Sequence, residues 1–79
     1  MKQYNIYVTN KVGVHDPAGR ATSEALADMA FEKVIDLRIG KLIKMQCMDD
    51  VSLDEVAEMC EKLLVNPVME DYQIEEVLG

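Results

Sequence analysis

Cysteine, histidine and aromatic residues are scarce in this chain of 79 residues, which has one histidine, three tyrosines, one phenylalanine and no tryptophan. Its two cysteines, Cys47 and Cys60, form no CxxC pattern, so a metal site is poorly supported. Both occupy positions where apolar residues recur, which predicts that they pack as small hydrophobic side chains. No signal-peptide-like apolar stretch follows Met1, so we expect a cytoplasmic protein with reduced thiols.

Basic residues and long apolar runs are also lacking. The chain has 8 basic and 15 acidic residues, a net charge of −7, and residues 49–79 contain one basic against ten acidic residues. Such an acidic region argues against binding to nucleic acid, whose phosphates attract the opposite charge. No apolar run approaches the roughly 18 residues of a membrane span, so we expect no membrane association.

The length predicts a single domain over residues 1–79. A chain of this size buries only about 60% of its unfolded surface, so its core is marginal. Disulfides and metals are poorly supported, while 49% of the residues are hydrophobic. We therefore expect a homo-oligomer, and the sequence leaves dimer and tetramer open.

The first half of the chain predicts a strand, a helix and a second strand. Tyr4, Ile6 and Val8 alternate with polar neighbours, a strand pattern. Asp16 and Pro17 predict a helix start, with Asp16 as the N-cap and Pro17 in the first turn. The spacing of small and apolar residues favours a helix to about residue 29. Alternation then predicts a second strand over residues 35–39.

The second half predicts a strand, a helix and a last strand. Gly40 and Lys41 fit a two-residue hairpin that leads into a strand over residues 42–48. Ser52 and Glu55 form a capping box before an apolar stripe over residues 53–64. Asn66 and Pro67 end that helix, and a strand follows from Tyr72.

The element order βαββαβ predicts an α+β fold, a two-layer ferredoxin-like sandwich. It would have an antiparallel four-stranded sheet with two helices on one face. The other face would carry no helix and would contact water or a partner. The side chains expected there include Tyr7, Thr9, Leu42 and Met48.

Catalytic patterns are few. His15 and Asp16 are the one histidine–carboxylate pair, and a triad would also need Ser23 or Ser52 as nucleophile. We expect Ser52 to cap a helix, so a loop histidine beside a helix cap is the better interpretation of His15. Gly13 and Gly19 flank a loop at a helix start, but the Asp16 carboxylate would repel an anion there.

Other chemistry is excluded by charge and position. The carboxylates at positions 54, 58 and 61 are expected on an exposed helix face. An RNA-binding domain of this fold would need stacking aromatic and basic residues. An acylphosphatase would need an arginine in the loop after the first strand, whereas Arg20 falls inside the predicted helix.

Arg38 and Lys41 are cationic residues beside Asp36 at the predicted hairpin. Two interpretations stay open for them. One is an ordinary pair of charges at a strand edge. The other is a docking or anion-contacting point for a larger partner.

Five short segments, taken together and in order, resemble the PurS family, the small subunit of phosphoribosylformylglycinamidine (FGAM) synthase. The resemblance covers nearly the whole chain and rests on residues 7–9, 13–19, 36–41, 59–64 and 66–72. It implies a non-catalytic subunit of de novo purine biosynthesis. It also implies two partners, the glutaminase PurQ, which releases ammonia, and the ATP-dependent synthetase PurL.

The resemblance implies that this chain bridges PurL and PurQ and assists ammonia transfer in the conversion of FGAR to FGAM. It implies no active site or bound cofactor here, with ATP, Mg and glutamine used by the partner subunits. The residues expected to contact a partner or define a turn are Asp16, Pro17, Arg20, Arg38, Gly40 and Lys41. The alternatives are a small-ligand-sensing regulatory module of the same fold and a small hydrolase using His15.

Overall fold

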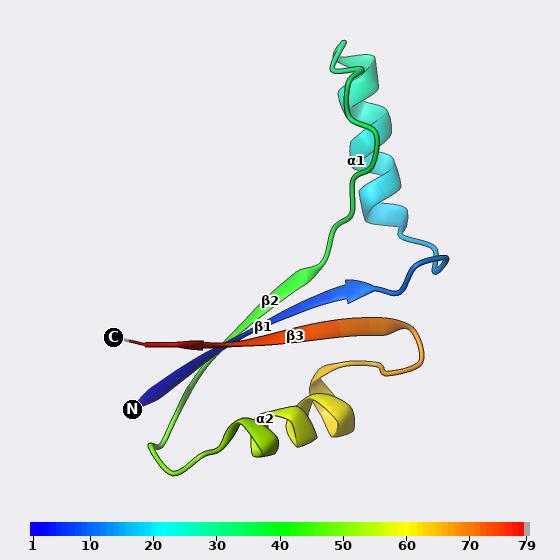
Figure 1. Cartoon of the computed structure of the whole chain (residues 1–79). Helices are drawn as coiled ribbons and strands as arrows, with labels where there is room; N and C mark the ends of the chain where they lie inside the picture. The colour runs from blue at the N-terminus through cyan, green and yellow to red at the C-terminus, as the bar shows by residue number, and fades with distance from the viewer. Residues whose placement is uncertain (79) are drawn as a thin grey trace.

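The sheet of this protein has three antiparallel strands. The computed structural model describes residues 1–78, and its strands are β1 (Lys2–Asn10), β2 (Lys41–Cys47) and β3 (Glu70–Val77). Their order is β2-β1-β3, so β1 lies in the middle and pairs with both neighbours (Figure 1). The helices are α1 (Pro17–Asp28) and α2 (Leu53–Met59), and α2 continues into a π-helical turn, η1 (Cys60–Leu64).

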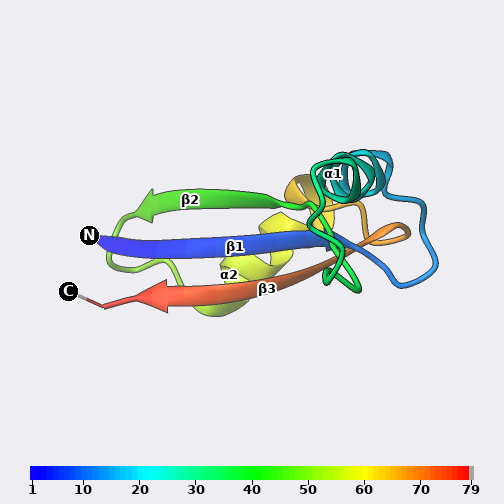
Figure 2. The ribbon, with the colours of Figure 1, turned by 90° about the horizontal axis from the view of Figure 1, so that it is seen from above.

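One face of the sheet carries the core. Ile6 lies opposite Ile43 on one side and Ile74 on the other, and α2 with η1 covers this face (Figure 2). The opposite face has no helix over it within residues 1–78, as the sequence predicts, and Tyr7 there donates a 2.9 Å hydrogen bond to Glu75. The buried side chains are Tyr4, Ile6, Val8, Val56, Cys60 and Val65.

The second helix follows the prediction at its start and departs from it near its end. The Ser52 hydroxyl accepts a 3.2 Å hydrogen bond from the Glu55 amide, which confirms Ser52 as the N-cap. The last turn widens, because the Val65 amide bonds five residues back to Cys60. This wider turn shifts the apolar stripe, so Cys60 is buried but Leu63 is 84% exposed.

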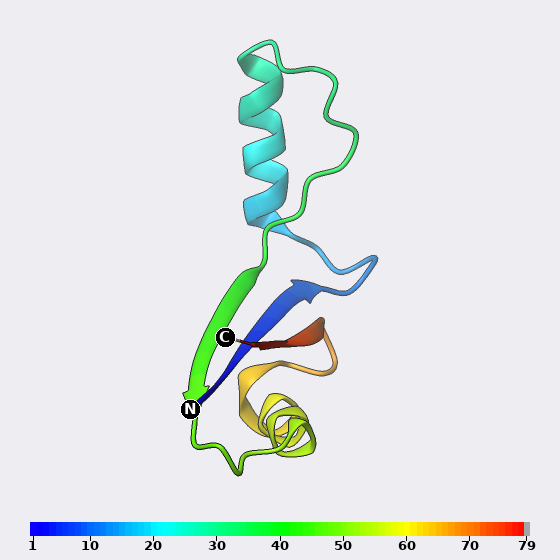
Figure 3. The ribbon, with the colours of Figure 1, turned by 60° about the vertical axis from the view of Figure 1, so that its left-hand side comes forward.

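The predicted four-stranded sandwich is wrong for the single chain. Residues 34–39 run extended beside α1 and form no strand, and the predicted hairpin at Gly40 and Lys41 is absent (Figure 3). The chain instead continues directly into β2, which pairs with β1. We call α1 and residues 29–40 the arm. It projects from the sheet, so only α2 and η1 lie on the core face.

Gly40 joins the arm to β2 at a close backbone contact. A Cβ atom at this position would collide with the carbonyl oxygen of Val8 in β1. This close approach, rather than a hairpin, is what requires glycine at position 40.

A Gly40→Ala variant is therefore expected to lose about 1–3 kcal/mol of stability, because backbone atoms cannot rotate away as a side chain can. Chemical denaturation measures the loss. Gln46→Ala is a suitable control, since Gln46 is exposed on the same strand. Equal stability of the two variants would contradict the close contact.

Candidate functional site: the base of the arm

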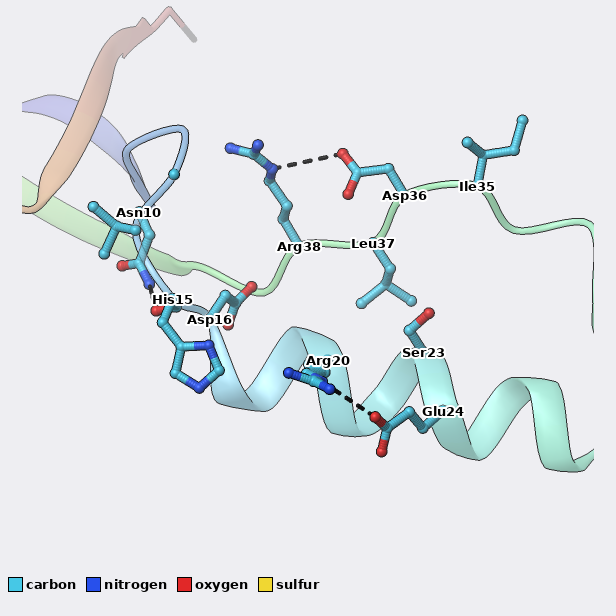
Figure 4. Close-up of a pocket in the computed structure, with 12 residues that line it drawn as sticks. Asn10, His15, Asp16, Arg20, Ser23, Glu24, Ile35, Asp36, Leu37 and Arg38 are labelled. Carbon is cyan, nitrogen blue, oxygen red and sulfur yellow. Dashed lines mark hydrogen bonds and ion pairs between the residues drawn. The ribbon is translucent and has the colours of Figure 1, made fainter.

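A polar cleft of about 430 Å³ lies where the arm leaves the sheet. Its walls are the loop after β1, the first turns of α1 and the extended segment that returns beside α1 (Figure 4). We call it the arm cleft. The residues that line it are Asn10, Gly13, Val14, His15, Asp16, Arg20, Ser23, Glu24, Ile35, Asp36, Leu37 and Arg38.

Asp16 holds the two sides of the arm together. One carboxylate oxygen accepts a 3.0 Å hydrogen bond from the Gly19 amide, as expected of the N-cap, and Pro17 begins the helix. The other oxygen accepts a 3.0 Å hydrogen bond from the Ile39 amide. These two bonds, that from Ile39 first, hold the pKa of Asp16 below its ordinary value. Asp16 therefore fixes the direction in which the arm leaves the sheet.

An Asp16→Asn variant is expected to release Ile39 while keeping the cap. An amide side chain has one acceptor oxygen, which serves the Gly19 amide, and its nitrogen cannot accept from Ile39. Exchange of the Ile39 amide hydrogen, followed by NMR, is expected to rise by about an order of magnitude. Asp36→Asn is the control, since Asp36 pairs with Arg38 at 3.6 Å, whereas the Ile39 amide bonds to Asp16. Unchanged exchange in Asp16→Asn would contradict the double contact.

The same contacts predict a pH dependence. Because the folded pKa of Asp16 is lowered, its contribution to stability is present above the unfolded pKa. That contribution is lost as the pH falls through the folded pKa, below the ordinary value of 3.8. Exchange of the Ile39 amide hydrogen, corrected for the pH dependence of exchange in an unfolded chain, is therefore expected to become faster as the pH falls through the folded pKa of Asp16.

The predicted contact residues lie together around the base of the arm. Asp16, Arg20 and Arg38 line the arm cleft. Pro17 begins α1, and Gly40 and Lys41 lie where the arm joins β2. Their contact with a partner stays a prediction.

Each cation here has a carboxylate neighbour, but its side chain stays largely open to solvent. Arg20 pairs with Glu24 at 3.2 Å and Lys41 with Glu70 at 3.9 Å. Exposed pairs of this kind add little stability, so these side chains can exchange partners at low cost.

The arm cleft does not assemble a triad. His15 and Ser23 both line it, but no hydrogen bond joins them in the part of the chain that the structure describes. Ser52 caps α2 and does not line the cleft. Among residues 1–78, no three His, Cys, Asp or Glu side chains gather as a metal site. No helix of the described chain is long and apolar enough to cross a membrane.

A second hollow was not predicted from the sequence. It has a volume of about 600 Å³, is mainly apolar, and lies between β2 and the outer side of α2 and η1. We call it the helix groove. The signal for it was the apolar stripe over residues 53–64, which η1 turns partly outward. The groove is lined by Met45, Glu55, Glu58, Met59, Lys62, Leu63 and Leu64.

Both cysteines are free thiols. Cys60 is buried in the core, and this burial raises the pKa of its thiol, which keeps it protonated and unreactive. Cys47 is half-buried at the end of β2. The predicted role of the cysteines as small packed side chains is confirmed for Cys60.

Comparison with solved structures defines the class of this small α+β protein. The chain superposes on the crystal structure of PurS from Bacillus subtilis with a TM-score of 0.87 and 44% identity, covering 99% of this chain and 100% of the other. A chain in the structure of PurLQS from Thermotoga maritima matches with a TM-score of 0.82 and 32% identity, covering 96% of both.

Sequence comparison gives the same result. The PurS subunit of B. subtilis is 45% identical over 100% of this chain and 99% of its own length. That of Archaeoglobus fulgidus is 38% identical over 89% of this chain and 91% of its own length. The family model described as "PurS: Phosphoribosylformylglycinamidine (FGAM) synthase" matches residues 3–77. The chain belongs to the PurS family, subunits of FGAM synthase in purine biosynthesis, which confirms the resemblance.

Proposed function

We propose that this chain is a non-catalytic subunit that bridges the PurL synthetase and the PurQ glutaminase of FGAM synthase in the cytoplasm. The observation that carries the proposal is its full-length likeness to a chain in the T. maritima PurLQS structure, a complex named for all three subunits. The subunit would assist the transfer of ammonia from PurQ to PurL during the conversion of FGAR to FGAM. ATP, Mg and glutamine would be bound by the partners.

The base of the arm is the surface proposed to meet a partner. It carries exposed cationic side chains, including Arg20 and Arg38, in a protein of net charge −7. These cations line the cleft at the base of the arm, and the arm projects from the sheet. A larger subunit can therefore approach them without disturbing the core. The six residues proposed to contact a partner or define its docking geometry are Asp16, Pro17, Arg20, Arg38, Gly40 and Lys41.

Self-association is part of the same proposal. The single chain has one helical layer on a three-stranded sheet and a projecting arm, so its core is incomplete relative to the ferredoxin-like sandwich. A second copy can supply the missing layer. The uncovered sheet face offers a further surface for a larger assembly.

Size-exclusion chromatography of this chain mixed with purified PurL and PurQ tests the bridging role. We expect PurL and PurQ to elute together, along with this chain, when it is added and to elute separately when it is left out. Elution of this chain apart from both would overturn the proposal. Calorimetric titration of this chain alone with amino acids and nucleotides tests the alternative of a ligand-sensing module. That alternative requires a saturable heat of binding.

A further inference from the structure

The outer edge of β3 has no strand beside it. In the order β2-β1-β3, β1 pairs with one side of β3, and no strand of residues 1–78 lies along the other side (Figure 2). Antiparallel pairing uses the N–H and C=O groups of alternate residues, so about half of the eight residues of β3 direct these groups away from β1. In the described chain, no backbone hydrogen bond outside the sheet involves residues 71–77. Such an edge is a template for an added strand.

The side chains along this edge differ between the two faces of the sheet. Tyr72 and Ile74 lie on the core face, where they are half-buried against the core. An added strand would cover their outer sides with apolar side chains of its own. Asp71 and Glu75 lie on the uncovered face, and both are exposed. The edge therefore fits a strand in which apolar and basic residues alternate.

The two carboxylates of the uncovered face are available to a partner. Asp71 pairs with Lys11 at 3.8 Å, and the Asp71 side chain is 66% exposed. Glu75 accepts hydrogen bonds from two neutral side chains of β1, at 2.9 Å from Tyr7 and 3.3 Å from Asn5. Long, exposed ion pairs contribute little stability, so a cation of the partner can replace Lys11 at low cost.

We propose that the outer edge of β3 receives an extended basic segment of a larger subunit as an added strand, an inference that rests on the bridging role in the proposed function. Backbone hydrogen bonds to β3 provide the affinity, and the side chains select the sequence of the segment. Lysine or arginine side chains four residues apart meet Asp71 and Glu75. Apolar side chains between them, on the other face of the strand, cover Tyr72 and Ile74.

The charge of β3 opposes pairing with the same edge of a second copy. Four of its eight residues are acidic and none is basic. A two-fold pairing centred on Gln73 would place Asp71 opposite Glu75. The same pairing would place Glu70 opposite Glu76. Like charges directly opposite each other are destabilising, so this edge repels its own copy and attracts a cationic strand.

The β2 strand of a second copy is also excluded as the occupant. β2 carries two lysines and no acidic residue, so its charge alone would fit. Pairing β3 of one copy with β2 of the next leaves an unpaired β2 at one end and an unpaired β3 at the other. Head-to-tail contacts of this kind extend into an open filament unless a rotation closes the ring. A single basic segment of a larger subunit instead ends the sheet and gives an assembly of defined size.

Hydrogen exchange tests the strand addition. In the chain alone, the β3 amide hydrogens that point away from β1 exchange quickly, whereas those bonded to β1 are protected. In the complex with PurL and PurQ, we expect exchange of the outward amides of residues 71–77 to slow by about an order of magnitude or more. Exchange takes place in the complex, and NMR of this chain, separated under quench conditions, reads the result at each residue.

A charge-reversal variant tests the chemistry of the segment. Asp71→Lys combined with Glu75→Lys reverses the charge of the edge, and we expect the affinity for the subunit that adds the strand to fall at least about tenfold. Asp50→Lys combined with Asp54→Lys is the matched control. It changes the net charge equally, with the same spacing, at exposed positions after β2 and in α2. We expect near-normal affinity in the control, and circular dichroism checks the fold of both variants.

The outcomes separate this inference from the bridging role. Co-elution of the unmodified chain with PurL and PurQ, without protection of the outward amides, would overturn the strand addition and leave bridging intact. Failure of the unmodified chain to co-elute would overturn both. Equal loss of affinity in the two double variants, or none in the β3 variant, would overturn the basic segment as occupant. Protection of the outward amides in the chain alone would assign the edge to a second copy and also overturn the proposal.

Discussion

An Ile6→Ala variant is expected to lose about 2–5 kcal/mol of stability. Ile6 is fully buried at the centre of β1, between Ile43 of β2 and Ile74 of β3. A domain of this size has a total free energy of unfolding of about 4–12 kcal/mol, so a cavity at this position removes a large share of its stability. Chemical denaturation measures the loss, at one fixed protein concentration because association adds to apparent stability.

Thr9→Ala is the matched control for that measurement. Thr9 lies on the same strand but is exposed on the uncovered face. Its replacement is expected to cost less than about 1 kcal/mol. Equal losses at the two positions would contradict a core confined to one face of the sheet.

An Arg38→Glu variant is expected to lower the affinity for the larger subunits by at least tenfold. A loss of about this size is expected when one charge pair across an interface is lost. Arg38 is exposed at the arm cleft, and its ion pair within residues 1–78 is with Asp36, at 3.6 Å. Reversing its charge opposes a partner carboxylate and, within the chain, removes the exposed ion pair with Asp36, which contributes little to stability. Binding is measured by sedimentation or calorimetry with PurL and PurQ, and circular dichroism checks that the fold is retained.

Lys33→Glu separates a local contact from a general charge effect. It changes the net charge by the same amount, but Lys33 lies toward the tip of the arm, away from the arm cleft. We expect near-normal assembly in this variant. Equal weakening in both variants, or none in Arg38→Glu, would remove the base of the arm as the contact surface.

Much of the fold could be predicted from local patterns. Alternation over residues 4–9 groups Tyr4, Ile6 and Val8 on one face, and the structure buries all three. The cap residues Asp16 and Ser52 also mark the helix starts correctly. These features depend on neighbours a few residues apart, so the sequence alone specifies them.

The arm could not be predicted because its structure depends on distant contacts. The alternation at Ile35, Leu37 and Ile39 correctly indicates extended chain, but it does not say which strand pairs with it. Gly40 resembled a turn residue, whereas its role is a close approach to Val8, more than thirty residues away in the sequence. The widening of the helix at η1 could not be predicted from the sequence either, and residues of η1 line the helix groove.

Three residues of the arm cleft were named from the sequence, but their arrangement was not predicted. Asp16 was expected to cap α1, and it does. The same carboxylate also accepts a hydrogen bond from the Ile39 amide, 23 residues away, and so holds the two sides of the arm together. The sequence grouped Arg20 and Arg38 as candidates, and the structure places both in one cleft.

Reconstitution of FGAM synthesis tests the bridging role most directly. Purified PurL and PurQ are supplied with FGAR and ATP, with and without this chain, using either glutamine or an ammonium salt as the nitrogen source. If this chain assists ammonia transfer, its omission abolishes the glutamine-dependent reaction and leaves the ammonium-dependent reaction intact. Equal glutamine-dependent rates with and without the chain would contradict the account.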